Sequence, residues 1–98
     1  MVQINWTHQA KNDLKSIADY ISKDSKRYAK LQVVRLKNRT DVLKNYIHSG
    51  RIVPELNIVD IRELIEGNYR IVYKIVSKRQ IDILTIHHSS RDLTSFDL

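Results

Sequence analysis

The sequence predicts an α+β fold in which one strand and two helices precede three further strands, in the order β-α-α-β-β-β. Apolar residues at helical spacing fill most of the first half of the chain. Three short apolar runs at 58–66, 68–76 and 81–88 then follow, separated by turn residues, which favours two consecutive antiparallel hairpins. Both helical stripes must be buried, so we expect a helical hairpin across one face of an antiparallel-rich sheet, with the opposite face open.

The N-terminal segment predicts a short strand followed by a capped helix. Residues 2–6 alternate apolar and polar side chains, which is the period of a strand with one buried face. The hydroxyl of Thr7 can then accept from a free N–H group in the first turn of a helix. The apolar stripe of this helix, about four turns long, has spacings of three and four residues. It consists of Ala10, Leu14, Ile17, Ala18 and Ile21.

A second, longer helix is expected after a break at residues 22–25, where Asp24 or Ser25 can cap it. Its narrow apolar seam continues as far as Ile47, and basic residues cover much of the remaining surface. We interpret those charges as a solvated face. The helix is predicted to finish around His48 and Gly50, with Gly50 as a left-handed stop.

The three C-terminal runs predict a sheet whose last strand is central. In the run 68–76, side chains alternate between an apolar or aromatic face and a face that includes Arg70 and Lys74. In the run 81–88, Ile81, Ile83 and Thr85 are expected on one face and Leu84 and Ile86 on the other, a pattern typical of a strand buried on both sides. The segment 52–56, which contains the only proline, is expected at an edge or bend.

Composition limits the classes of function. A chain of 98 residues fits a single domain, 1–98, and it has no cysteine for a disulfide or a thiolate metal site. Four histidines without metal-ligand spacing and only two glycines predict neither a metal site nor a phosphate loop, so we expect no cofactor and no metal. The net charge of +6 favours a polyanionic or acidic partner. No apolar segment is long enough to span a membrane, so a cytoplasmic protein without a membrane partner is expected.

Five short motifs, in this order, carry a family resemblance over nearly the whole chain. They are Leu14-x-x-Ile17-x-x-Tyr20-Ile21, Gly50-Arg51-x-Val53-Pro54-Glu55, Ile61-Arg62-Glu63-Leu64, Tyr69-Arg70-Ile71-Val72-Tyr73 and His88-Ser89-Ser90-Arg91. Together they resemble the RelE/ParE superfamily of toxins from bacterial and archaeal type II toxin-antitoxin systems, and the motif string is most similar to the ParE branch. The resemblance implies the same fold, a growth-inhibiting toxin with a plasmid-stabilisation type of role, and a cognate antitoxin as partner.

Two activities share this superfamily scaffold. ParE-like members poison DNA gyrase, and RelE-like members are mRNA interferases that cut message in the ribosomal decoding site. We expect the gyrase-inhibitor activity here, with no reaction catalysed, because the motifs resemble the ParE branch. The alternatives are a ribosome-dependent, metal-independent endoribonuclease, and a non-toxic module that only binds antitoxin.

The resemblance also names candidate site residues. If the chain is a nuclease, Arg70 and Arg91 would neutralise the scissile phosphate while His88 and Glu55 exchange protons. If it is a binder, the same region would contact the target or another anion. The candidate anion-binding or target-binding cations are Arg51, Arg62, Arg70, Lys74 and Arg91.

Arg70 and Glu55 have structural alternatives, and the sequence departs from the RelE pattern in two places. Arg70 can instead pair with Glu55 or Glu63, and His87 is expected to face away from His88 as a packed or hydrogen-bonded residue. RelE carries a lysine pair near its second strand, but residues 52–60 contain no lysine or arginine. The C-terminal tyrosine of RelE is also missing, and Phe96 is the nearby aromatic that could stack in its place.

Overall fold

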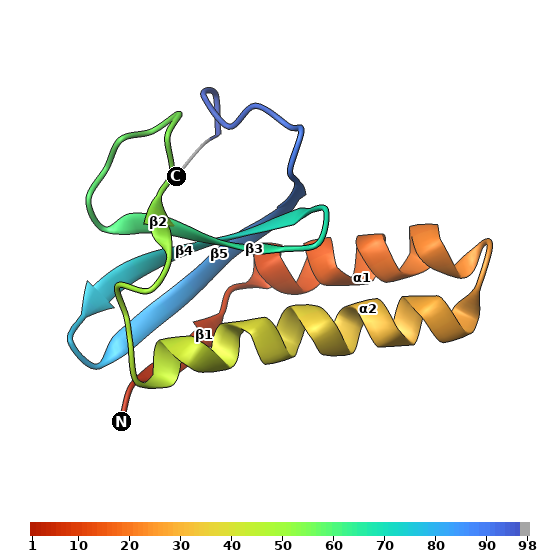
Figure 1. The fold of residues 1–98 in the computed structure, drawn as a ribbon, viewed down its shortest axis with the longest axis horizontal. Helices are drawn as coiled ribbons and strands as arrows, with labels where there is room; N and C mark the ends of the chain where they lie inside the picture. Colours follow the sequence, from red (N-terminus) through yellow and green to blue (C-terminus); the bar gives the residue numbers. More distant parts are fainter. Residues whose placement is uncertain (97–98) are drawn as a thin grey trace.

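The computed structural model describes residues 1–96 and has the predicted α+β architecture. In chain order the elements are β1 (Gln3–Trp6), α1 (His8–Ser22), α2 (Lys26–Arg39), the 3₁₀ helix η1 (Thr40–Lys44), β2 (Arg51–Ile52), β3 (Ile61–Glu66), β4 (Tyr69–Ser77) and β5 (Gln80–His88). They form one five-stranded sheet in the order β1-β5-β4-β3-β2, in which only the β1–β5 pair is parallel. The helices α1 and α2 pack as a hairpin across one face (Figure 1). The short edge strand β2 is an addition to the predicted order.

Both helices begin at the predicted caps. The Thr7 hydroxyl accepts from the Ala10 N–H at 3.2 Å, and the Ser25 hydroxyl accepts from the Tyr28 N–H at 3.0 Å. Thr7 also donates to the Ile83 carbonyl oxygen at 2.6 Å, which ties the start of α1 to β5, an interior strand next to the central strand β4. The caps therefore fix where each helix starts and how α1 enters the helical layer.

The predicted long second helix is wrong in its C-terminal third. The regular helix ends at Arg39, and a 3₁₀ turn followed by an irregular segment leads to β2. Gly50 is not a left-handed stop, because Gly67 is the only glycine with positive φ among the described residues. A Cβ at Gly50 would instead lie 2.6 Å from both the Tyr73 ring and the Glu63 carbonyl oxygen. Glycine is therefore required here for close approach to the sheet rather than for backbone conformation.

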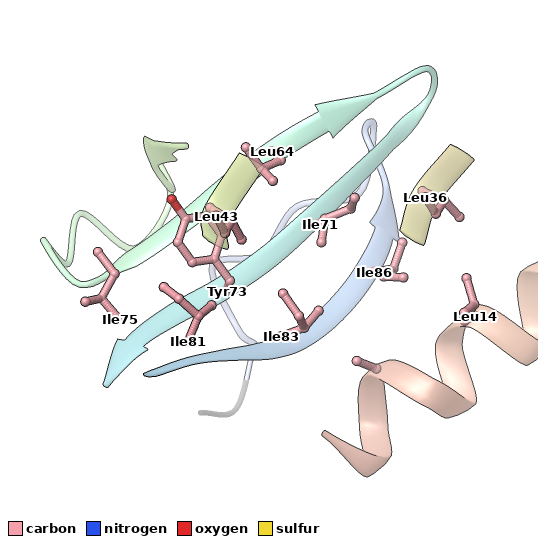
Figure 2. Close-up of a cluster of buried hydrophobic side chains, with 11 residues drawn as sticks. Leu14, Leu36, Leu43, Leu64, Ile71, Tyr73, Ile75, Ile81, Ile83 and Ile86 are labelled. Carbon is pink, nitrogen blue, oxygen red and sulfur yellow. The ribbon is translucent and has the colours of Figure 1, made fainter. Parts of the chain in front are cut away.

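The main core lies between the helical hairpin and the sheet (Figure 2). Its buried members are Ala10, Leu14, Leu36, Leu43, Leu64, Ile71, Tyr73, Ile75, Ile81, Ile83 and Ile86. The alternation predicted for β4 is confirmed, because Ile71, Tyr73 and Ile75 face the helices. Tyr73 is fully buried, and its hydroxyl donates to the Ile47 carbonyl oxygen at 2.8 Å and accepts from the Gly50 N–H at 2.9 Å.

The predicted faces of the second half of β5 are wrong, because a β-bulge interrupts the alternation of its side chains. Tyr73 pairs with Ile83 while the preceding Val72 pairs with Thr85, so Leu84 is an extra residue. Beyond the bulge the faces exchange, and Ile86 joins Ile83 in the core beneath the helices. Asp13 of α1 accepts from the Ile86 N–H at 3.1 Å, where β1 no longer runs beside β5.

The middle of the second face of the sheet is covered, which overturns the expectation that this face is open, although Ile65, Lys74 and Val76 remain exposed on it. The segments 53–60 and 89–96 lie over it (Figure 1) and build a smaller core with the far sides of β3, β4 and β5. That core consists of Val53, Ile61, Val72 and Leu93, with Leu56, Leu84 and Phe96 packed against it. No helix in the described part of the chain is long and apolar enough to cross a membrane.

Candidate functional site

Arg70 sits at the centre of an ion-pair network beneath the C-terminal segment. Its guanidinium forms a fork with Glu55, with Nη1–Oε2 at 2.5 Å and Nη2–Oε1 at 2.7 Å. It also contacts Glu63, with Nε–Oε1 at 2.7 Å and Nη2–Oε1 at 2.6 Å. Nη1 donates further to the Arg91 carbonyl oxygen at 3.0 Å. Four of these contacts are hydrogen bonds and the fifth is an ion-pair contact, and together they engage all three guanidinium nitrogens.

The network continues to both sides of Arg70. The Glu63 side chain is fully buried and accepts a further bond from Nε of Arg51 at 2.6 Å. Glu55 accepts from the Leu93 N–H at 3.0 Å, which fastens the C-terminal segment over the sheet. Two guanidinium groups thus balance two carboxylates, and a buried cluster of this kind is neutral overall.

The protonation of the network follows from these contacts. The hydrogen bond from Arg70 is the largest cause that lowers the pKa of Glu55 to about 2, although burial opposes it. The hydrogen bond to Glu55 in turn raises the pKa of Arg70. Arg70 is only 4% exposed. The structure therefore pairs Arg70 with both Glu55 and Glu63, as the structural alternative predicted, and leaves its guanidinium no free face.

His88 lies on the opposite face of the sheet from this network. It pairs with Tyr69 across the β4–β5 ladder, and the two rings meet edge to face at 6.0 Å. Nδ1 of His88 lies 2.8 Å from the Ser90 hydroxyl. Tyr69 packs against the core beneath the helices, whereas Arg70 points the other way. The expectation that Arg70, His88 and Glu55 share one surface is therefore wrong.

His87 is the imidazole that shares a face with Arg70, and the sequence reasoning missed it as a site residue. It pairs with Arg70 across the ladder, its Nε2 lies 3.1 Å from the Thr85 hydroxyl, and its ring meets Phe96 at 5.6 Å. Burial, and then the charge of Arg91, lower its pKa. The predicted packed and hydrogen-bonded role of His87 is confirmed. Strict alternation would have put His87 on the face of Ile81 and Ile83, and only the bulge at Leu84 brings it beside Arg70, so no local signal in the sequence announced this placement.

His87 opens into a polar pocket of about 460 Å³. The pocket is lined by the N-terminal part of α1 and the C-terminal segment, through Gln9, Asp13, His87, Arg91, Asp92, Leu93, Ser95 and Phe96. Asp13 is already engaged, since it accepts from the Thr85 hydroxyl and from Gln9 at 2.8 Å. Arg91 is exposed at the rim of this pocket.

The five predicted anion-binding cations do not form one patch. Arg62 points toward the helical face and donates to the Val59 and Gly50 carbonyl oxygens at 3.1 and 3.0 Å. Arg51 is bound by Glu63, while Lys74 is exposed on the opposite face of the sheet from Arg62. The described residues contain no group of three or more acidic or histidine side chains that could hold a metal ion.

A larger groove lies elsewhere, between α1 and α2 and alongside β1. It encloses about 690 Å³, and its apolar floor includes Ile4, Trp6, Leu14 and Val33. Lysine side chains line its rim, namely Lys11, Lys15, Lys37 and Lys44. A second trough of about 540 Å³ continues along the hairpin past Ala18 and Val33. The basic residues interpreted as a solvated face therefore border an apolar channel.

Comparisons with known proteins agree with this architecture. The family described as the ParE toxin of the type II toxin-antitoxin system parDE matches residues 4–93. A Sinorhizobium fredii protein designated as a toxin, Y4kP, is 36% identical over 89 residues, covering 89% of this chain and 88% of that protein.

Two solved structures are similar to the whole fold. A chain from a chromosomal ParDE toxin-antitoxin system of P. aeruginosa superposes with a TM-score of 0.73 at 24% identity, covering 90% of this chain and 96% of that one. A chain from the RelBE2 toxin-antitoxin complex of Mycobacterium tuberculosis gives a TM-score of 0.55 at 18% identity, with coverages of 89% and 96%. The fold and these matches define the class of protein as a type II toxin of the RelE/ParE superfamily. Within that class, the chain belongs to the ParE toxin family.

Proposed function

We propose that this toxin acts by binding and poisoning DNA gyrase, and that it catalyses no reaction itself. The observation that carries the proposal is the saturated guanidinium of Arg70, whose five contacts go to Glu55, Glu63 and a backbone carbonyl. In the nuclease alternative this arginine must meet a phosphate. Such a contact would require breaking a buried, fully hydrogen-bonded pair, which costs several kcal/mol.

The acid-base groups of the nuclease alternative are equally ill placed. A carboxylate with a pKa near 2, as for Glu55, is a weak general base at neutral pH. His88, the intended proton donor, lies on the other face of the sheet from Glu55 and Arg70. The family match to ParE rather than RelE supports the same conclusion.

A cognate antitoxin is the second partner we propose, seated in the groove between α1 and α2. The groove is lined by apolar side chains and four lysines, of which Lys44 pairs with Asp41 at 3.3 Å, so its lining keeps a net positive charge that suits an amphipathic segment carrying carboxylates. Solved relatives in the comparisons come from toxin-antitoxin systems and support such a partner. An acidic segment would also offset part of the net charge of +6.

One observation favours the endoribonuclease as a second candidate function. The polar pocket brings His87, Arg91 and Phe96 together, which are an imidazole, a cation and an aromatic ring. These are the group types that proton transfer, phosphate binding and base stacking require. In this alternative His87, rather than His88, would carry the proton.

Induced expression in a bacterial host tests the proposal. Gyrase poisoning predicts filamentation and a DNA-damage response while amino-acid incorporation continues at first. Arrest of protein synthesis within minutes, before any DNA damage, would favour the nuclease. Growth without any defect would instead indicate a module that only binds antitoxin.

A further inference from the structure

A chain of three polar side chains joins α1 to the polar pocket. Asp13 of α1 reaches the edge of β5 beyond the point where β1 ends, and there it accepts from the Ile86 N–H at 3.1 Å and from the Thr85 hydroxyl. The Thr85 oxygen in turn lies 3.1 Å from Nε2 of His87. Thr85 is fully buried, and the half-buried ring of His87 lines the pocket. These contacts form the Asp13–Thr85–His87 chain.

The chemistry of the three groups fixes the direction of each hydrogen bond. A carboxylate can only accept, so the single proton of the Thr85 hydroxyl must point to Asp13. Asp13 also accepts from Gln9 at 2.8 Å and from the Ile86 N–H, so its carboxylate is held from three sides. The Thr85 oxygen has no second proton to give, and it must therefore accept from His87. His87 thus carries its proton on Nε2.

The other ring nitrogen of His87, Nδ1, has no proton when the ring is neutral. Within residues 1–96 no side chain or backbone group hydrogen-bonds to this Nδ1, and no buried side-chain nitrogen or oxygen there lacks a partner. Nδ1 is therefore accessible to solvent, and the polar pocket is a cavity that His87 lines. The chain consequently presents an unprotonated nitrogen at a cavity of about 460 Å³.

The charges around His87 favour its neutral form. Burial is the largest cause that lowers the pKa of His87, and Arg91 and Arg70 lower it further against the opposing charge of Asp13. The remaining carboxylate of the pocket, Asp92, is engaged within the C-terminal segment by hydrogen bonds of 2.9 and 2.6 Å. A neutral imidazole with a fixed proton and a free lone pair can accept a proton at neutral pH.

We infer that His87 is the proton acceptor of the polar pocket, and that Asp13, acting through Thr85, positions it. A ligand that suits this site offers an O–H or N–H group to Nδ1, beside the exposed guanidinium of Arg91. The inference goes beyond the proposed gyrase contact. It rests on the second candidate function only for the use of the acceptor, because that candidate requires proton transfer.

Nitrogen-15 NMR of the purified full-length toxin tests the chain directly. We expect His87 to be protonated on Nε2 and unprotonated on Nδ1, with a resolved Nε2–H proton signal that the hydrogen bond to Thr85 protects from exchange. Thr85→Val removes the hydroxyl and should lose this protected signal, whereas Thr85→Ser restores a hydroxyl and should keep it. Asp82→Asn is the matched control, because Asp82 also accepts from side chains but lies at the other end of β5.

The charge of Asp13 has a readout of its own. Asp13→Asn keeps the shape of the side chain and removes a charge that raises the pKa of His87, so the NMR titration of His87 should move to lower pH. Asp82→Asn should leave that titration where it is in the wild type. Thermal unfolding checks that each variant stays folded, and if Thr85→Val unfolds, the wild-type spectrum and the Asp13→Asn titration still test the chain.

The inference is overturned if the wild type carries the His87 proton on Nδ1. It is also overturned if folded Thr85→Val keeps the protected Nε2–H signal, or if Asp13→Asn titrates like the wild type. Cleavage of ribosome-bound message by the same samples is measured separately. If the wild type leaves the message intact, the second candidate function is lost, while the spectra still assign the proton acceptor.

Discussion

Replacing Arg70 with methionine should destabilise the fold strongly while leaving the activity of each folded molecule unchanged. The substitution leaves the fully buried carboxylate of Glu63 paired only with Arg51, which is 62% exposed, and removes the guanidinium that pairs with Glu55, whose side chain is 20% exposed. Breaking a buried ion pair by removing one partner typically costs about 3–5 kcal/mol. With a urea m-value of about 1.5 kcal/mol/M for a chain of this size, the unfolding midpoint should fall by about 2–3 M.

A second substitution tests the cause of this loss. In Arg70→Met with Glu63→Leu, the fully enclosed carboxylate is gone, and Arg51, which is 62% exposed, loses its partner at little cost. The double variant should be about 1–3 kcal/mol more stable than Arg70→Met alone. Arg79→Met, at an exposed turn position, is the control and should change stability by about 0.5 kcal/mol or less.

Two results would refute this reasoning. Equilibrium urea unfolding that places Arg70→Met within about 1 kcal/mol of the wild type would show that the network is not a buried pair. Gyrase inhibition by the double variant, normalised to the folded fraction, should stay within about threefold of the wild type. A loss of about a hundredfold or more would assign Arg70 a direct chemical role instead.

The remaining predictions concern acid stability, the close approach at Gly50 and the groove. The pKa of Glu55 in the fold, about 2, lies below its ordinary value of 4.5, so its pairing stabilises the protein fully above pH 4.5 and this contribution is lost as the pH falls toward 2. In that pH window, the stability of Glu55→Gln should therefore depend less on pH than the stability of the wild type, as measured by acid titration followed by circular dichroism. Parallel curves for the two proteins would contradict the assignment. Gly50→Ala should cost about 1–3 kcal/mol in thermal unfolding, because the added methyl would lie 2.6 Å from the Tyr73 ring, and an unchanged midpoint would show that the loop yields freely. Charge reversal at Lys15 and Lys37 should weaken antitoxin binding by about tenfold in titration calorimetry and leave gyrase inhibition intact. An unchanged affinity would show that the antitoxin does not bind in the groove.

Local chemistry was sufficient to predict most of the fold. The caps at Thr7 and Ser25 were readable because short hydroxyl side chains preceded apolar stripes, and the alternation in β4 fixed which residues face the helices. Two features depended on tertiary contact and could not be read locally. The seam that predicted one long helix is interrupted after Arg39, and the bulge at Leu84 reverses the faces of the strand that follows it.

The candidate site was less predictable, because it depends on which face each residue occupies and on what covers that face. The pairing of Arg70 with Glu55 and Glu63 was foreseen as an alternative, but charge pattern alone did not decide between a free and a bound guanidinium. The C-terminal segment covers the second face of the sheet because Leu93 packs into the smaller core, and no periodic pattern in the sequence predicts that contact.

The central claim is that this ParE-family toxin binds its target without cutting RNA, because Arg70 is held in a structural ion-pair network. Purified protein applied in parallel to gyrase acting on relaxed plasmid and to ribosomes programmed with message tests it most directly. The account predicts loss of supercoiling at toxin concentrations that leave the message intact. Cleaved message with unimpaired supercoiling would contradict it.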